Sequence, residues 1–136
     1  MLGRILLTCA LSIPSGCLGA ASLHERAVAH NARAVELITS GALAEARGAL
    51  EVALEYNPRF AEAHANLGLV AMRQGRLEDA EARLLEAVSL NPDFAEAWTN
   101  LAAISSATAR LDEALERARR AARVDPDFAE ARALLV

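Results

Sequence analysis

The chain has 136 residues, and its 14 basic residues, all of them Arg, are outweighed by 18 acidic residues, which gives a formal net charge of −4 at pH 7. This balance argues against non-specific attraction to nucleic acid or to an anionic lipid surface, because both need a basic surface. The length allows one ordinary domain, and many Ala residues with only 4% aromatic residues favour helix.

Residues 1–21 have the outline of a secretory signal peptide. Arg4 supplies a positive start, an uncharged apolar run follows from Ile5 to Ile13, and small residues follow Pro14. As a helix the run would rise only about 14 Å, which is too short to span the hydrocarbon core of a bilayer. We expect this segment to be removed during export to the periplasm or the cell envelope.

Two cleavage routes are open. The small residues at 19–21 match the spacing of an ordinary signal peptidase site, which would release a mature chain from about Ser22. The residues at 15–17 resemble instead the end of a bacterial lipobox. Cleavage at that site would make Cys17 the new N-terminus, where it would carry a lipid and anchor the protein to a membrane. Pro14 departs from the lipobox pattern, which prefers a Leu-like residue there.

Gly and Pro divide the rest of the chain into predicted helices joined by loops that allow only antiparallel neighbours. The predicted ranges are 25–39, 43–56, 59–74, 77–90, 93–108 and 111–124. Asn57, Asn91 and Asp125 are each followed by Pro, so that a favourable cap residue precedes a residue suited to the first helical position. We therefore expect each of these Pro residues to start a helix.

A repeat links these helices. The letters NPRFAEA from Asn57 return as NPDFAEA from Asn91 and as DPDFAEA from Asp125, a period of 34 residues. The second unit carries His64, Leu67, Gly68, Ala71, Gly75, Leu77, Ala80, Leu84, Ala87 and Pro92. This pattern resembles the tetratricopeptide repeat. The third unit keeps most of it, and the first keeps less.

The resemblance implies an all-α fold, an α-solenoid of antiparallel helix pairs over residues 22–136. The expected units are about 27–60, 61–94 and 95–128, followed by a partial unit or capping helix at 129–136. The chain ends on apolar Leu134, Leu135 and Val136. These residues either pack back onto the third pair or mark a self-association contact.

Catalytic and metal-binding patterns are missing from the sequence. His24 opens a motif like that of zinc proteases, but Val28 stands where the second His is needed. His30 and His64 occupy equivalent places, with Trp98 in the third unit, which favours a packing role over metal binding. We expect a protein that is not an enzyme and has no metal or other cofactor.

The resemblance places function in a groove. The first helix of each pair lines the concave face of such solenoids, and the family often uses an Asn there to bond the backbone of an extended peptide. Asn66 and Asn100 match this Asn, although they could equally bridge neighbouring helices, and Ala32 breaks the match in the first unit. The predicted groove residues are Asn31, Val35, Ile38, Glu62, Asn66, Leu69, Met72, Arg73, Glu96, Thr99, Asn100 and Ala103.

Charge patterns narrow the partner class. Glu62, Glu96 and Glu130 stand where the clamp that holds the C-terminal carboxylate of heat-shock proteins needs basic residues, so a carboxylate would be repelled there. The predicted helix at 111–124 starts with acidic residues and ends with a cluster of Arg residues. This arrangement either complements the helix dipole or offers a binding site for an acidic partner. The cluster comprises Arg117, Arg119, Arg120 and Arg123.

These observations predict a small exported bacterial scaffold or adaptor that binds a peptide or helix of a cell-envelope protein. Nucleic acid is not expected as a partner, and a membrane only through a lipid on Cys17. The alternatives are a self-assembling structural component and a lipid-anchored assembly factor of the type used in pilus or outer-membrane biogenesis.

Overall fold

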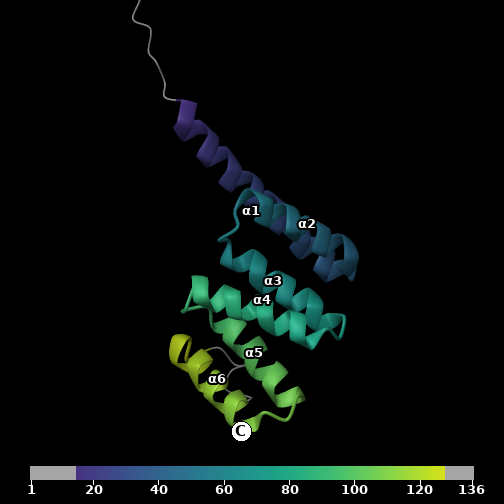
Figure 1. Cartoon of the computed structure of the whole chain (residues 1–136), viewed down its shortest axis with the longest axis vertical. Helices are drawn as coiled ribbons and strands as arrows, with labels where there is room; N and C mark the ends of the chain where they lie inside the picture. The colour runs from purple at the N-terminus through teal and green to yellow at the C-terminus, as the bar shows by residue number, and fades with distance from the viewer. Residues whose placement is uncertain (1–14, 128–136) are drawn as a thin grey trace, which may run out of the picture.

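The computed structural model describes the backbone of residues 15–127 and the side chains of residues 23–127. Within this range all of the regular secondary structure is α-helix, and turns connect the helices. The helices are α1 (Ser15–Ser40), α2 (Leu43–Tyr56), α3 (Ala61–Arg73), α4 (Leu77–Leu90), α5 (Ala95–Ala107) and α6 (Leu111–Val124). Figure 1 shows three successive helix pairs stacked along the long axis, which confirms the predicted α-solenoid.

The second helix of every pair has the predicted bounds, but α3 and α5 begin two residues later than predicted. The expectation that Pro58 starts a helix is wrong. Asn57 ends α2 in an extended conformation, and its side-chain Oδ1 accepts a hydrogen bond from the backbone N–H of Arg59 at 3.2 Å. Phe60 is the N-cap of α3. Extended backbone is what a residue before Pro prefers, so the Asn-Pro pair forms a turn instead of a cap.

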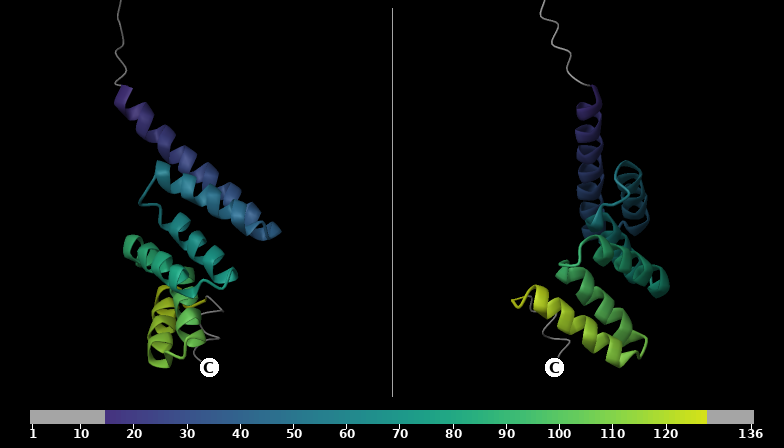
Figure 2. Two further views of the ribbon diagram at one scale, coloured as in Figure 1. Left: turned by 45° about the vertical axis from the view of Figure 1, so that its right-hand side comes forward. Right: turned by 60° about the vertical axis from the view of Figure 1, so that its left-hand side comes forward.

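Helix α1 is longer than predicted, because it begins at Ser15 and not near residue 25. It therefore runs through Cys17 and through the predicted cleavage site after Ala21. Its N-terminal part projects beyond α2 (Figures 1 and 2). None of the helices in residues 15–127 is both long enough and apolar enough to cross a membrane. The start of the leader and the predicted cap at 129–136 lie outside the described residues.

The core is built from small residues that let the helices approach closely. One buried cluster joins the first two pairs around Leu50 and Val70, and a second joins the last two pairs around Leu84 and Leu101. Gly68 shows how close this approach is, because a Cβ added there would lie 2.6 Å from Cγ of Leu84. Packing of this kind leaves the outer side of each helix free for other roles.

Candidate functional site

Residues on α1, α3 and α5 form four rows that cross the first helices of the three pairs. On each helix the members of successive rows are three or four residues apart, so they share one side of the helix. We call this surface the A-helix face. Its rows are Val28, Glu62 and Glu96; Ala32, Asn66 and Asn100; Val35, Leu69 and Ala103; and Thr39, Arg73 and Ala107.

Apolar side chains occupy the third row of the A-helix face. Val35 is 45% exposed, and Val28 in the first row is 43% exposed. Leu69 and Ala103 are half-buried, and Leu69 packs against the core of the first two pairs. Met72, one turn beyond Leu69, is half-buried against the other cluster. The row therefore offers apolar contact area on a firmly packed base.

The two Asn residues in the second row differ in their contacts. Asn66 donates from Nδ2 to Oδ1 of Asn31 on α1 at 2.9 Å, so it bridges neighbouring helices. Asn100 is half-buried and makes no side-chain hydrogen bond to any residue in the described range. Asn100 thus keeps its amide available to a ligand, whereas Asn66 shares its amide with Asn31.

Three predicted groove residues have internal roles. Ile38 and Thr99 are each only 5% exposed, so the expectation that they line an open surface is wrong. Ile38 belongs to the first core cluster, and Thr99 donates its hydroxyl to the carbonyl of Ala95 at 3.0 Å. Arg73 donates from Nη1 to the carbonyl of Ile38 at 2.9 Å, an acceptor near the end of α1 that it shares with the backbone N–H of Gly41 at 3.2 Å.

Glu62 and Glu96 lie side by side in the first row, in the first turns of α3 and α5. Both are exposed, and within residues 23–127 neither carboxylate makes an ion pair or a hydrogen bond. A carboxylate in the first turn is stabilised by the helix dipole, which explains why these positions tolerate negative charge. They give the A-helix face an acidic edge.

The repeated His and Trp positions serve packing. His64 is 7% exposed, and its Nε2 lies 3.0 Å from the carbonyl of Pro58. Trp98 makes the equivalent bond, donating from Nε1 to Pro92 at 2.8 Å. His30 stacks on Tyr56 with a centroid distance of 5.7 Å. The described residues contain no group of three or more His, Cys, Asp or Glu side chains that could hold a metal ion.

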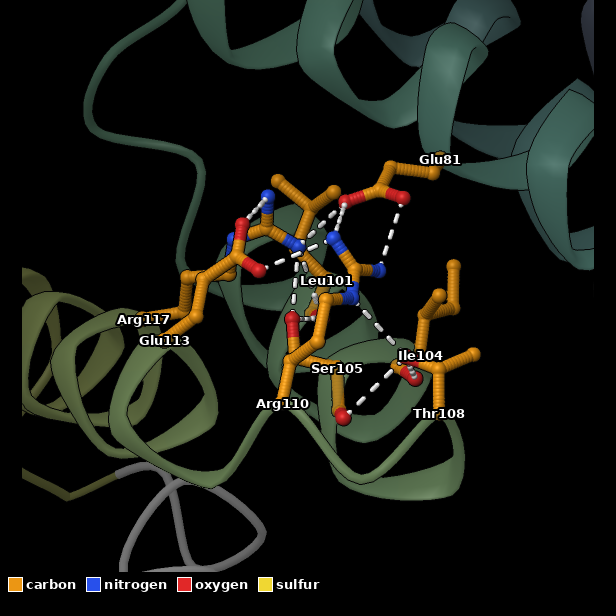
Figure 3. Close-up of polar contacts among 8 residues, drawn as sticks. All are labelled: Glu81, Leu101, Ile104, Ser105, Thr108, Arg110, Glu113 and Arg117. Carbon is orange, nitrogen blue, oxygen red and sulfur yellow. Dashed lines mark hydrogen bonds and ion pairs between the residues drawn. The ribbon is translucent and has the colours of Figure 1, made fainter.

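Sequence reasoning missed a polar cluster between the second and third pairs, which Figure 3 shows. Glu81 on α4 accepts a hydrogen bond from Arg110 at 2.8 Å and one from Arg117 on α6 at 2.7 Å. Arg117 also donates to the hydroxyl of Ser105 at 2.7 Å, and Glu113 pairs with both Arg residues. The hydrogen bond from Arg110 is the main cause that lowers the pKa of Glu81.

This cluster changes the interpretation of the Arg-rich end of α6. Arg117 is held by Glu81 and Glu113, and the guanidinium of Arg120 lies over the ring of Trp98, 5.0 Å from its centroid. Both residues therefore act within the protein. Only Arg119 and Arg123 remain exposed without such contacts among the described residues.

A cavity of about 530 Å³ opens between α2 and α4 above α3, and the α3 residues that line it, His64, Leu67 and Ala71, do not belong to the A-helix face. Its charged rim is largely self-paired, since Arg47 lies 3.6 Å from Glu51 and Arg76 lies 2.7 Å from Asp79. Its lining residues are Arg47, Glu51, His64, Leu67, Ala71, Arg76, Asp79, Ala82, Arg83 and Glu86. No sequence motif indicated this cavity.

The fold and the exposed face define a helical-repeat protein with an open surface across its first helices. Two family models described as tetratricopeptide repeat match residues 37–99 and 84–116, which together cover more than half of the chain. The chain belongs to the tetratricopeptide repeat family, as the 34-residue period predicted. No curated protein matches it.

Solved structures with the same fold are distant in sequence. The first tetratricopeptide domain of Spaghetti (RPAP3), bound to the HSP90 peptide SRMEEVD, has a TM-score of 0.78 at 21% identity and covers 82% of this chain and 89% of that one. The Arabidopsis OM64 domain has a TM-score of 0.79 at 15% identity, covering 82% and 93%. The second domain of human RPAP3, in complex with an HSP70 peptide, has a TM-score of 0.76 at 18% identity, covering 83% and 94%.

Proposed function

We propose that this protein is a non-catalytic scaffold whose A-helix face binds a peptide or helix of a protein partner. The observation that carries the proposal is the apolar row with exposed Val35 and half-buried Leu69, beside the amide of Asn100, which makes no side-chain hydrogen bond among the described residues. Apolar anchors with a few polar groups that fix a ligand backbone are the usual composition of a peptide-binding surface. Two of the similar structures hold peptides, which supports this type of ligand.

A random peptide library displayed on phage and panned against residues 22–136 tests this function. Val35→Glu is the diagnostic variant, because it places a charge in the apolar row at an exposed position and leaves the core intact. Ala82→Glu is the matched control, since Ala82 is exposed on α4 beside the cavity. We expect selected peptides to lose binding to the first variant and to keep binding to the second. Peptides that bind both variants equally would refute the proposal.

We also propose that the partner is a component of the bacterial cell envelope and that the protein is exported to meet it. The support is the positive start, apolar run and small residues of the leader at 1–21. The intact mass of the protein recovered from bacterial envelopes tests this. A chain that starts near Ser22 would be free in the periplasm, one that starts at Cys17 with acyl mass would be membrane-tethered, and an unprocessed chain would contradict export.

A second candidate function is self-assembly through the end of the third pair. Leu111 is 68% exposed and Leu115 is 38% exposed, whereas Leu77, which is equivalent to Leu111 in the second unit, packs against the core. Exposed apolar residues at the end of a solenoid are suited to contact another copy. Sedimentation of the parent and of Leu111→Glu tests this, and a parent that stays monomeric at all concentrations would refute it.

A further inference from the structure

We propose that the A-helix face selects segments in which basic residues accompany apolar anchors, and that it rejects acidic segments and free C-terminal carboxylates. This inference rests on the proposed function and adds the chemistry of the partner. It concerns the charge of the ligand, whereas the function itself concerns only where a ligand binds.

The charges on the A-helix face carry the first step. The carboxylates of Glu62 and Glu96 are exposed and, among the described residues, have no ion-pair partner. Arg73 in the fourth row is exposed and keeps its positive charge although it donates to the carbonyl of Ile38, so two carboxylates stand against one guanidinium and the rows carry a net charge of −1. A ligand that approaches this face therefore meets net negative charge.

The flanking charges do not reverse this sign. Arg33 on α1 is paired with Glu36 at 2.8 Å, so it contributes no net charge. Arg59 and Asp93 lie in the turns before α3 and α5, where their charges offset each other. The basic residues of α6 lie on a helix outside this face.

The geometry of the rows sets the spacing of the ligand. Packed helices lie about 8–10 Å apart, and a peptide in the polyproline II conformation advances about 3.1 Å per residue and returns a side chain to the same side at every third residue. A ligand of this conformation that crosses α1, α3 and α5 therefore places apolar side chains three residues apart over Val35 and Leu69. Ala103 ends this row with a small side chain, which leaves room for a larger anchor. The Asn100 amide lies one row away, where it can bond the ligand backbone.

Three synthetic peptides test the inference by fluorescence anisotropy. The first has Leu at every third position with Arg between, and both of its ends are blocked. The second replaces each Arg with Glu, and the third is SRMEEVD with a free carboxylate, the peptide held by one of the similar structures. We expect the Arg peptide to bind the parent more tightly than the other two, and increasingly so at low salt.

Matched variants distinguish the effect of charge on the A-helix face from the effect of the net charge of the protein. The pair Glu62→Gln with Glu96→Gln is expected to weaken binding of the Arg peptide about three- to tenfold, since each exposed ion pair contributes little. The pair Glu86→Gln with Glu116→Gln removes the same charge from exposed positions on α4 and α6 and is expected to change nothing. Equal weakening by both pairs would overturn the inference.

The outcomes also separate the inference from the proposed function. If the Glu peptide or SRMEEVD binds as tightly as the Arg peptide and still loses binding to Val35→Glu, the face binds peptides and only the charge preference is wrong. If the Arg peptide binds the parent and Val35→Asn, which removes the apolar side chain without adding charge, equally well, both are wrong. If it does not bind the parent, the charge preference is wrong, and the phage selection decides on the function.

Discussion

Arg117 of α6 donates from Nη1 to Oε1 of Glu81 of α4 at 2.7 Å, so a single carboxylate joins the third helix pair to the second. The side chain of Arg117 is 11% exposed, and it has further acceptors in Ser105 and Glu113. Removing the charge of Glu81 leaves this guanidinium partly buried with less compensation. Contacts between neighbouring units govern the stability of a solenoid, so this pair is expected to matter for the whole fold.

Glu81→Gln should lower the free energy of unfolding at pH 7 by about 1–3 kcal/mol, because it leaves a partly buried cation with less counter-charge. Urea denaturation measures the loss. Glu116→Gln is the control, since Glu116 is exposed on α6 and makes no ion pair among the described residues.

The effect of Glu81→Gln should depend on pH. The hydrogen bond from Arg110, with a further one from Arg117, lowers the pKa of Glu81 against the opposing effect of burial. A carboxyl with a lowered pKa stabilises the fold fully above its unfolded pKa of about 4.3, and this contribution is lost as pH falls through the folded pKa. The difference between parent and variant should therefore shrink in acid, and a difference that stays constant with pH would contradict this account.

Ala109→Gly should raise the free energy of unfolding by about 0.5–1 kcal/mol. Ala109 has a φ of 59° in the turn between α5 and α6, and the equivalent positions hold Gly41 at 82° and Gly75 at 74°. A left-handed backbone is unfavourable for Ala and free of cost for Gly. Thermal denaturation measures the gain, and Ala107→Gly, at the end of α5, should instead destabilise. A loss of stability in Ala109→Gly would show that this turn is not strained.

Gly68→Ala and Gly48→Ala form a second matched pair within helices. A Cβ at Gly68 would lie 2.6 Å from Cγ of Leu84, so we expect a loss of about 1–2 kcal/mol from overpacking. A Cβ at Gly48 meets nothing within 4 Å, so we expect a gain of about 0.5–1 kcal/mol from helix propensity. Urea denaturation of both variants checks this, and equal effects would mean that the approach of α3 to α4 is looser than described.

The second row of the A-helix face separates structural from binding roles. Asn31→Ala should cost about 0.5–1.5 kcal/mol of stability, because it removes the hydrogen bond to Asn66. Asn100→Ala should leave stability unchanged and weaken peptide binding, since Asn100 makes no hydrogen bond within the described range. Chemical denaturation and anisotropy measured on the same samples distinguish the two roles. Loss of stability in Asn100→Ala without loss of binding would reverse the assignment.

The sequence alone predicted the helix pairs, because a 34-residue period with small residues at fixed places constrains many positions together. The prediction of helix boundaries failed where the same residues suit two different local structures. Asn57 and Pro58 have the chemistry of a helix start, but the same chemistry also makes a turn, and the turn is formed. The first helix was expected to begin near residue 25, yet α1 already begins at Ser15.

The candidate site was only partly predictable. Helical periodicity predicted residues that are mostly at least partly exposed, but it could not show that Ile38 and Thr99 lie deep enough between neighbouring helices to be buried. The partners of Glu81 were not predictable either, because Arg110 and Arg117 come from the next unit, and their approach depends on how the pairs stack. The cavity between α2 and α4 depends on the same stacking.

The central claim is that the A-helix face is the binding surface, and a nitrogen–proton NMR titration with the Arg-containing peptide tests it most directly. The side-chain amides of Asn66 and Asn100 report on the second row, and the backbone amides of Val35 and Leu69 report on the third. We predict that these signals shift first and that those of Arg47 and Asp79 at the cavity stay in place. Shifts confined to the cavity, with the Asn amides unmoved, would contradict the account.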